Sequence, residues 1–213
     1  PVYQQMGRRR NPWSMATVFL VGGIYNSKLG EIMAYRLGFL LCDHLLEHLS
    51  GEFDDYPEMF ATAFAEVSSA IDWHVYDLLE GEVPYHVAEC DGYLISGSRH
   101  GVYDSLPWIP LLEAVISDIA RSDKPLVGLC FGPQILGQTL GGPVEKVPQG
   151  WGIGIHEYQV HVDQSWMYPR RAPFVIPACH QDQVVTLPAG AQRIASNDHC
   201  ENFVIPYGER MLG

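Results

Sequence analysis

The sequence is poor in basic residues, and those that it has do not form a patch. Its 213 residues include 13 lysines and arginines against 25 aspartates and glutamates, which gives a formal net charge of −12. The one basic cluster is Arg8–Arg10. Because an acidic surface repels the phosphate backbone, the sequence predicts that nucleic acid is not a partner.

Long apolar runs and closely paired cysteines are also missing. No stretch reaches the ~20 apolar residues that span a membrane, so no membrane association is expected. The cysteines are odd in number and show no Cys-x-x-Cys spacing, which favours free thiols in a reducing compartment and hence a cytoplasmic protein. For all of them except Cys130, a small buried side chain is expected. The five positions are Cys42, Cys90, Cys130, Cys179 and Cys200.

The composition nevertheless supports a sizeable core, because 47% of the residues are hydrophobic and 18% are charged. The length fits one domain, or one domain with an appendage. Residues 1–32 lack a periodicity that continues into the core, so they are predicted to be an extension outside a domain that spans residues 33–213. Arg8–Arg10 and the apolar Ala16–Ile24 loosely resemble a signal peptide, but no clear small-residue cleavage site follows them.

From Leu37 onward, short apolar runs alternate with amphipathic stretches. Such alternation implies a parallel sheet covered by helices on both faces. After Trp151 the patterns at 155–162 and 182–186 alternate residue by residue, which predicts mixed or antiparallel strands. The predicted fold is a three-layer α/β sandwich with a mostly parallel central sheet, flavodoxin-like in its first half. Strands are predicted at 37–41, 72–76, 92–96 and 125–129, and helices at 58–70, 108–121 and 132–140.

The segment that indicates chemistry is Leu126–Leu136, where an apolar strand leads through a turn into a helix. The turn has the Gly-x-Cys-x-Gly form of a nucleophile elbow, in which glycines relieve crowding at a sharp backbone bend. It places the thiol of Cys130 above the carboxyl end of the sheet, where the N-terminus of the helix favours the thiolate. The N–H of Phe131 is placed to stabilise an oxyanion. The alternative is an ordinary strand-to-helix turn that contains a buried cysteine.

Three motifs, in this order, resemble those of class I glutamine amidotransferases. Gly128–Gln134 resembles the nucleophile motif of that family, Leu94–Asp104 its oxyanion loop, and Cys179–Val184 its His-x-Asp-x-Val segment. The resemblance extends from about Leu37 to the C-terminus. It is closest to stand-alone proteins similar to the amidotransferase domain of GMP synthase, and it implies their α/β fold and their cysteine-based amide hydrolysis.

The resemblance implies a role for each matching residue. Cys130 would attack the side-chain amide of glutamine, forming a γ-glutamyl thioester and releasing ammonia. Gly97 and Phe131 would offer N–H groups to the oxyanion. The implied partners are L-glutamine or a γ-glutamyl compound, with a separate ammonia-accepting synthetase as a further candidate. No cofactor is implied.

On the substrate side, the resemblance assigns Gln134 to substrate contact. It assigns Gln181 and Asp182 to the α-amino-acid end of the substrate. For His180, structural support together with substrate contact is expected in place of a direct role in proton transfer. No metal site is expected, because the histidines between positions 44 and 86 do not follow a zinc-binding spacing.

Two departures from the family pattern bear on activity. Ser98-Arg99 stands where the family usually has Gly-Pro, which leaves the geometry of the oxyanion loop open. The family's catalytic base is a histidine in a His-Pro-Glu segment after a late strand. Residues 207–213 resemble the start of that strand, and no His-Pro-Glu follows within the 213 residues. The domain is therefore expected to be incomplete at its C-terminus, and the 213-residue chain to be inactive.

Two other functions remain open on the sequence. A γ-glutamyl peptidase or related cysteine hydrolase would use the same elbow with a different leaving group. A catalytically inactive binding or regulatory domain would retain the fold without the histidine and glutamate of the triad.

Overall fold

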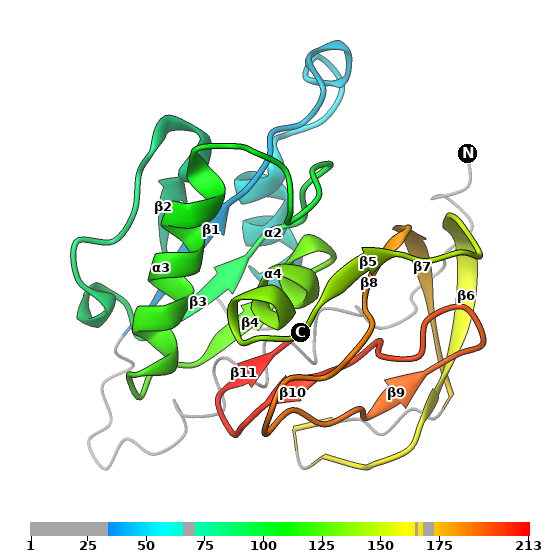
Figure 1. Ribbon diagram of the computed structural model, residues 1–213. Helices are drawn as coiled ribbons and strands as arrows, with labels where there is room; N and C mark the ends of the chain where they lie inside the picture. The colour runs from blue at the N-terminus through cyan, green and yellow to red at the C-terminus, as the bar shows by residue number, and fades with distance from the viewer. Residues whose placement is uncertain (1–33, 66–70, 165, 168–172) are drawn as a thin grey trace.

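The computed structural model describes residues 34–65, 71–164, 166–167 and 173–213 (Figure 1). The predicted extension at 1–32 and the last part of the helix predicted at 58–70 lie outside these residues. The described part contains a six-stranded sheet in the order β10-β11-β4-β3-β1-β2. Every neighbouring pair is parallel except β10 with β11. Its strands are β1 (Tyr35–Leu41), β2 (Ile71–Asp77), β3 (Gly92–Ile95), β4 (Leu126–Gly128), β10 (Pro206–Tyr207) and β11 (Met211–Leu212).

Helices cover this sheet on both faces, and each face has its own core. Phe39 and Leu41 pack with Phe60 and Phe64 of α2, whereas Leu40 packs with α3 and α4 on the opposite face. A parallel strand between two helical layers is apolar on both sides, which explains the almost continuous apolar run of β1. The predicted three-layer α/β fold is therefore confirmed. The helices are α2 (Tyr56–Ala65), α3 (Trp108–Ala120) and α4 (Phe131–Thr139), with the short 3-10 helices η3 (Glu47–Leu49), η4 (Leu78–Glu80) and η5 (Val87–Glu89).

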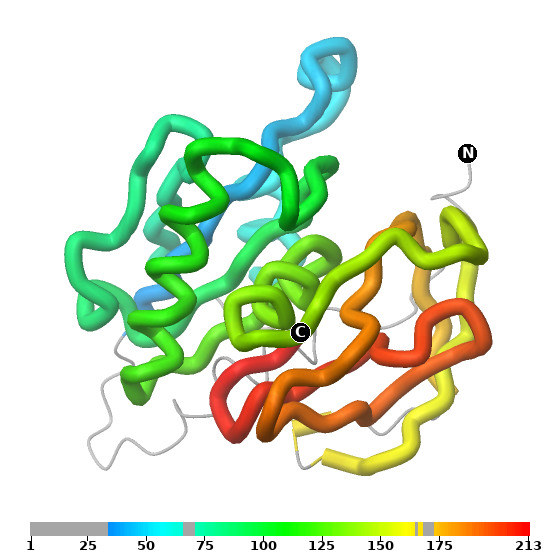
Figure 2. Tube along the Cα trace, viewed as in Figure 1, coloured from blue at the N-terminus to red at the C-terminus, as the bar shows by residue number. Residues whose placement is uncertain are grey.

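The second half of the chain forms antiparallel strands, as the alternating patterns predict. The short strands β5 (Val144–Lys146) and β8 (Asp182–Val184) pair with each other. A separate sheet has β6 (Gly152–Val160) between β7 (Phe174–His180) and β9 (Ala195–Ser196). Figure 2 shows that the end of the chain then returns from this region to the first-half sheet, where β11 lies beside β4.

Strand β7 lies at an edge of its sheet within the described residues. Pro177 occupies the middle of this strand and pairs with Ile155 of β6. A proline has no N–H to donate to a ladder, so it is tolerated on an edge strand. Ile153, Ile155 and Val175 leave an exposed apolar surface on this pair of strands.

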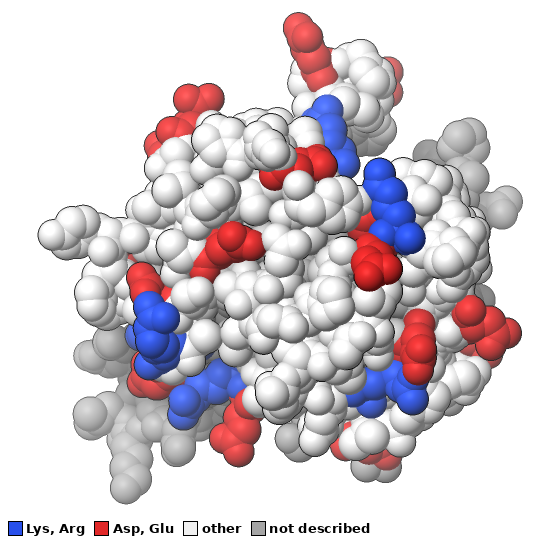
Figure 3. All heavy atoms as spheres, in the orientation of Figure 1, with Lys and Arg blue, Asp and Glu red and all other residues white. Residues whose placement is uncertain are grey.

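The surface of the described residues is mixed in charge. On the face shown in Figure 3, each lysine or arginine lies beside an acidic residue. No helix in the described ranges is long and apolar enough to cross a membrane.

Candidate functional site

The nucleophile elbow lies between β4 and α4, where Cys130 is the N-cap residue of α4. Cys130 has φ 57° and ψ −89°, and it is the only residue other than glycine with a positive φ in the described part of the chain. A backbone held in such a conformation costs about 1–3 kcal/mol and persists only where its surroundings enforce it. The position predicted for Cys130, at a strand-to-helix turn on the carboxyl edge of the parallel sheet, is confirmed.

The two glycines of the elbow make the bend possible. A Cβ atom on Gly128 would lie 2.6 Å from the carbonyl carbon of Gly132 and 2.7 Å from its Cα. No side chain fits at that distance, so the close approach of strand and helix requires glycine. The N–H of Leu129 donates to the carbonyl of Ile95 at 3.1 Å, which ties the elbow to β3.

The loop after β3 lies directly opposite the thiol. A Cβ atom on Gly97 would lie 3.5 Å from the Cβ of Cys130 and 3.9 Å from its Sγ. The hydroxyl of Ser96 donates to the carbonyl oxygen of Gly97 at 3.0 Å and accepts from the N–H of Cys42 at 2.8 Å. The structure thus brings Gly97 to the elbow, with the predicted oxyanion donor Phe131 next to Cys130 in the chain.

The electrostatics of the thiol differ from the sequence-based expectation of a favoured thiolate. Cys130 retains exposed surface, yet burial of the thiol raises its pKa and the nearby Cys179 adds to this increase, while a hydrogen bond from the N–H of Phe131 opposes it. Desolvation disfavours the charged form of a thiol, and one N–H donor does not offset it here. The pKa of Cys130 therefore lies above its ordinary value, and its proton must be removed before attack.

The neighbouring Cys179 corrects a second expectation. It was predicted to be buried, as were Cys42, Cys90 and Cys200, and those three are buried. Cys179 is instead exposed, because it lies on the open face of β7, and its charge acts on Cys130. All five cysteines are free, as predicted.

The residues predicted to bind substrate are partly brought together beside the elbow. Gln134 is buried in the first turn of α4, and its side-chain amide donates to the backbone carbonyl of Asp182 at 2.9 Å. The carboxylate of Asp182 accepts a hydrogen bond from the hydroxyl of Tyr103 at 2.7 Å. The carbonyl of Gln181 accepts from the N–H of Val147 at 3.3 Å. Tyr103 was expected only as part of the oxyanion-loop motif, and its contact with Asp182 was not predicted.

His180 ends β7 and is less directly connected to the thiol. Burial lowers its pKa, which favours the neutral ring. Its Nε2 is buried, and no hydrogen-bond partner for it lies among the described residues. The ring lies 5.8 Å from that of His199, measured between centroids. His180 therefore packs beside His199. In the described part of the chain, no group of three or more histidine, cysteine or acidic residues is arranged to hold a metal ion.

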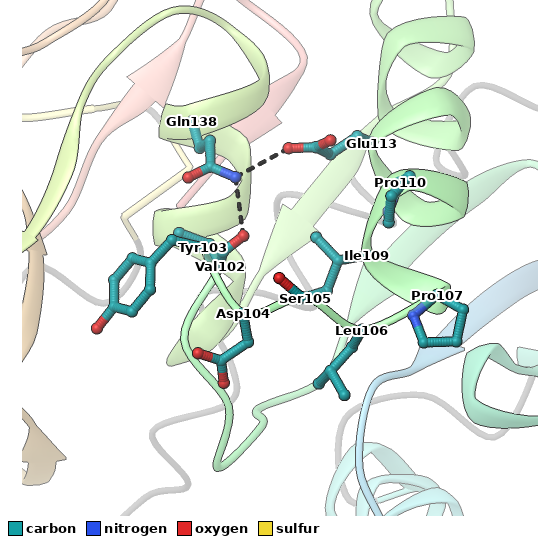
Figure 4. Close-up of a pocket in the computed structure, with 10 residues that line it drawn as sticks. All are labelled: Val102, Tyr103, Asp104, Ser105, Leu106, Pro107, Ile109, Pro110, Glu113 and Gln138. Carbon is teal, nitrogen blue, oxygen red and sulfur yellow. Dashed lines mark hydrogen bonds between the residues drawn. The ribbon is translucent and has the colours of Figure 1, made fainter.

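A groove of about 520 Å³ lies next to this region, between the 102–107 loop and α3 (Figure 4). The amide of Gln138 spans it at one end, donating to the carbonyl of Val102 and to the carboxylate of Glu113, both at 2.9 Å. The groove is not lined by Cys130 or Gly97. The candidate site is therefore defined by the elbow and not by the groove.

One residue that contacts the oxyanion loop, Asp43, was not recognised as part of the site from the sequence. Asp43 follows the carboxyl end of β1 and forms an ion pair with Arg99 of the oxyanion loop, with Nε 2.7 Å from the carboxylate. The usable signal was the position of Asp43, because polar residues directly after parallel strands gather at one edge of the sheet.

Comparisons with known proteins identify a family. A family model described as glutamine amidotransferase class-I matches residues 54–208. Gamma-glutamyl peptidase 3 of Arabidopsis thaliana is 26% identical over 186 residues, which cover 84% of this chain and 73% of that protein. A glutamine-hydrolysing GMP synthase of Dehalococcoides mccartyi is 30% identical over 136 residues, 61% of this chain and 24% of that protein.

The solved structures support the fold. The crystal structure of a glutamine amidotransferase from Thermotoga maritima superposes with a TM-score of 0.71 at 22% identity, covering 84% of this chain and 74% of that one. At this level of identity the likeness concerns the arrangement of strands and helices.

Proposed function

Because the chain belongs to the class I glutamine amidotransferase family, we propose that it hydrolyses the side-chain amide of glutamine, with Cys130 as the nucleophile. The observation that carries this proposal is the strained Cys130 at the strand-to-helix turn, with Gly97 opposite its thiol. A strained backbone conformation of this kind is typical of a nucleophile elbow, in which the side chain must project above the sheet. The amidotransferase-like domain is proposed to include residues 33–213, which contain the matched residues 54–208.

The chemistry begins with removal of the thiol proton, since the pKa of Cys130 is raised. The sulfur attacks the amide carbon, and the N–H groups of Gly97 and Phe131 are proposed to stabilise the oxyanion. The C–N bond then breaks, ammonia leaves with the proton that the thiol gave up, and water hydrolyses the γ-glutamyl thioester to glutamate and the free thiol. We assign His180 to supporting the end of β7 and not to proton transfer, because no hydrogen bond links it to Cys130.

The substrate's α-amino-acid end is proposed to lie against Asp182. The carboxylate is held by Tyr103, and the backbone of Asp182 is held by Gln134, so it is oriented before substrate arrives. An α-ammonium group is a natural partner for this carboxylate. Gln181, which precedes it, is proposed to contribute through its backbone. When glutamine is the substrate, a separate synthetase is the proposed acceptor of the ammonia.

A second candidate function is γ-glutamyl peptide hydrolysis, in which an amino acid leaves in place of ammonia. It is favoured by the resemblance to the Arabidopsis gamma-glutamyl peptidase. The elbow and the site around Asp182 serve both reactions, because both substrates share the γ-glutamyl group.

The test is to incubate the protein with L-glutamine and, separately, with a γ-glutamyl dipeptide, and to measure released glutamate. Cys130→Ala should abolish release from both, whereas Cys179→Ser, which removes the neighbouring exposed thiol, should retain it. Equal release by Cys130→Ala would refute the nucleophile. An absence of release from both substrates, the outcome expected if these 213 residues lack the catalytic base, would instead favour a binding or regulatory domain.

A further inference from the structure

Asp43 is a charged side chain in an unusual place. It follows the carboxyl end of β1 and is only 4% exposed, which makes it the one buried carboxylate among the described residues. A buried charge is costly unless it is paired and hydrogen-bonded. The groups that donate hydrogen bonds to this carboxylate should therefore explain why it is buried.

Most of the hydrogen bonds to the Asp43 carboxylate are donated by Arg99. Its backbone N–H donates to Asp43 at 2.8 Å, Nε donates at 2.7 Å, and Nη2 donates at 2.8 Å to the other carboxylate oxygen. Nη2 also donates to the carbonyl of His44 at 2.7 Å. Such a two-pronged pair fixes the direction of the guanidinium as well as its distance. Burial raises the pKa of Asp43, but the hydrogen bonds from Arg99 together outweigh it and hold the pKa below its ordinary value.

This pair acts on the loop that faces the nucleophile. Arg99 follows Gly97 by two residues, and a Cβ atom on Gly97 would lie 3.5 Å from that of Cys130. At the other end of the same short segment, Ser96 is tied to the N–H of Cys42. Residues 96–99 are thus held at both ends by consecutive residues that follow β1, Cys42 and Asp43.

We propose that Asp43 and Arg99 form a positioning pair that holds the oxyanion loop, residues 96–99, against Cys130. Residues 96–99 contain no proline to restrict their backbone, so the ion pair supplies the restraint. The pair accelerates acyl transfer by keeping the loop in place for the oxyanion, and it contributes little to substrate affinity. This proposal rests on the proposed function only for the identity of the reaction that the loop serves.

The test uses the full chain and L-γ-glutamyl-p-nitroanilide, whose first turnover releases coloured nitroaniline as Cys130 is acylated. Asp43→Asn and Arg99→Gln should each lower the maximal burst rate by about 10²-fold, the loss typical of a reacting geometry displaced by about 1 Å. The substrate concentration that gives half of the maximal burst rate should stay unchanged. The double variant should be no slower than either single variant, because both act through one pair. Arg121→Gln, which removes an exposed pairing with Asp118 on α3, is the matched control and should keep the wild-type rate.

Two further measurements separate positioning from general damage. Alkylation of Cys130 by iodoacetamide needs no oxyanion loop, so its rate should be the same in all these proteins. Hydrogen exchange at the amides of residues 96–99 should accelerate by 10-fold or more in both variants and not in Arg121→Gln.

Each outcome decides the proposal. Wild-type burst and exchange rates in Asp43→Asn and Arg99→Gln would overturn it, and so would a parallel loss of alkylation. If the wild-type protein gives no burst at all, the proposed function fails, while the exchange rates still test whether the pair holds the loop.

Discussion

The hydroxyl of Tyr103 donates a hydrogen bond to the carboxylate of Asp182 at 2.7 Å, joining residues that are 79 positions apart in the sequence. Burial, and then this carboxylate, raise the pKa of Tyr103, so its hydroxyl remains a donor at neutral pH. The contact fixes one carboxylate oxygen at the edge of the proposed substrate site.

Replacing Tyr103 with Phe is expected to raise KM for a γ-glutamyl substrate by about 3- to 10-fold, because Asp182 loses a charge-assisted hydrogen bond whose value is reduced by exposure to solvent. Steady-state kinetics would show the effect in KM more than in kcat. Tyr85→Phe is the control, since Tyr85 is 98% exposed. An unchanged KM in Tyr103→Phe would indicate that Asp182 is held without this bond.

The elbow should not tolerate a side chain at Gly128. Gly128→Ala would force a methyl group to within 2.7 Å of the backbone of Gly132, so it is expected to destabilise the protein by about 3 kcal/mol or more. Thermal or denaturant unfolding would measure this loss. Gly51→Ala, where a methyl group meets nothing within 4 Å, should change stability by less than about 0.5 kcal/mol. Similar stabilities for the two variants would contradict the geometry of the turn.

The thiol of Cys130 should lose its proton at a higher pH than an ordinary cysteine does. Its ordinary pKa is 9.0, and burial followed by the effect of Cys179 raises it. Alkylation by iodoacetamide is therefore expected to be slow at pH 7 and to accelerate with pH, with a midpoint higher than that of an ordinary cysteine thiol. Cys179→Ser should lower the midpoint, because a like charge is removed. A midpoint near neutrality would mean that the N-terminus of α4 outweighs burial.

A second titration concerns His44, whose Nδ1 lies 2.6 Å from a carboxylate oxygen of Asp55 and whose Nε2 lies 3.0 Å from one of Asp77. The hydrogen bond to Asp55 is the largest cause that raises the pKa of His44 above its ordinary 6.5; partial burial opposes it, and Asp77 adds to it. Because the folded-state pKa exceeds the unfolded one, the stabilisation is complete below about pH 6.5 and is lost as pH rises through the folded-state pKa.

The free energy of unfolding should therefore differ most between the wild type and His44→Gln at pH 5.5–6.5. This difference in unfolding free energy should be about 0.5–1 kcal/mol, since His44 is partly exposed, and it should decrease towards pH 9. Denaturant titrations at several pH values would measure it. A gap that widens with rising pH would show that the neutral ring is the stabilising form.

The elements nearest Cys130 could be predicted because local sequence determines them. The spacing of Gly128 and Gly132 around Cys130 leaves few conformations other than a sharp strand-to-helix turn, and the turn is where it was expected. Strand β1 was predicted from Leu37 and begins at Tyr35, because its first residues pair with β2 through a register that the apolar pattern does not reveal. Strand β7 was not predicted, since Pro177 interrupts the pattern that identifies a strand.

Contacts between distant segments were harder to foresee. Asp43 and Arg99 are 56 positions apart, and their pairing depends on β1 lying beside β3 in the sheet. The raised pKa of Cys130 follows from how closely side chains surround it, which no motif reports. The roles of Gly97, Phe131, Gln134 and Gln181 remain predictions that rest on position and resemblance.

The proline in β7 has a consequence for how this protein behaves at high concentration. The edge of a sheet is a template for another chain, and here it adjoins exposed Ile153, Ile155 and Val175. Pro177 removes a backbone donor and leaves a bulky ring in the middle of that seven-residue strand, so an incoming strand cannot form a continuous ladder. The proline is therefore expected to keep this apolar surface from templating fibrous assembly, and replacing it with a β-branched residue is expected to lower the solubility of the protein.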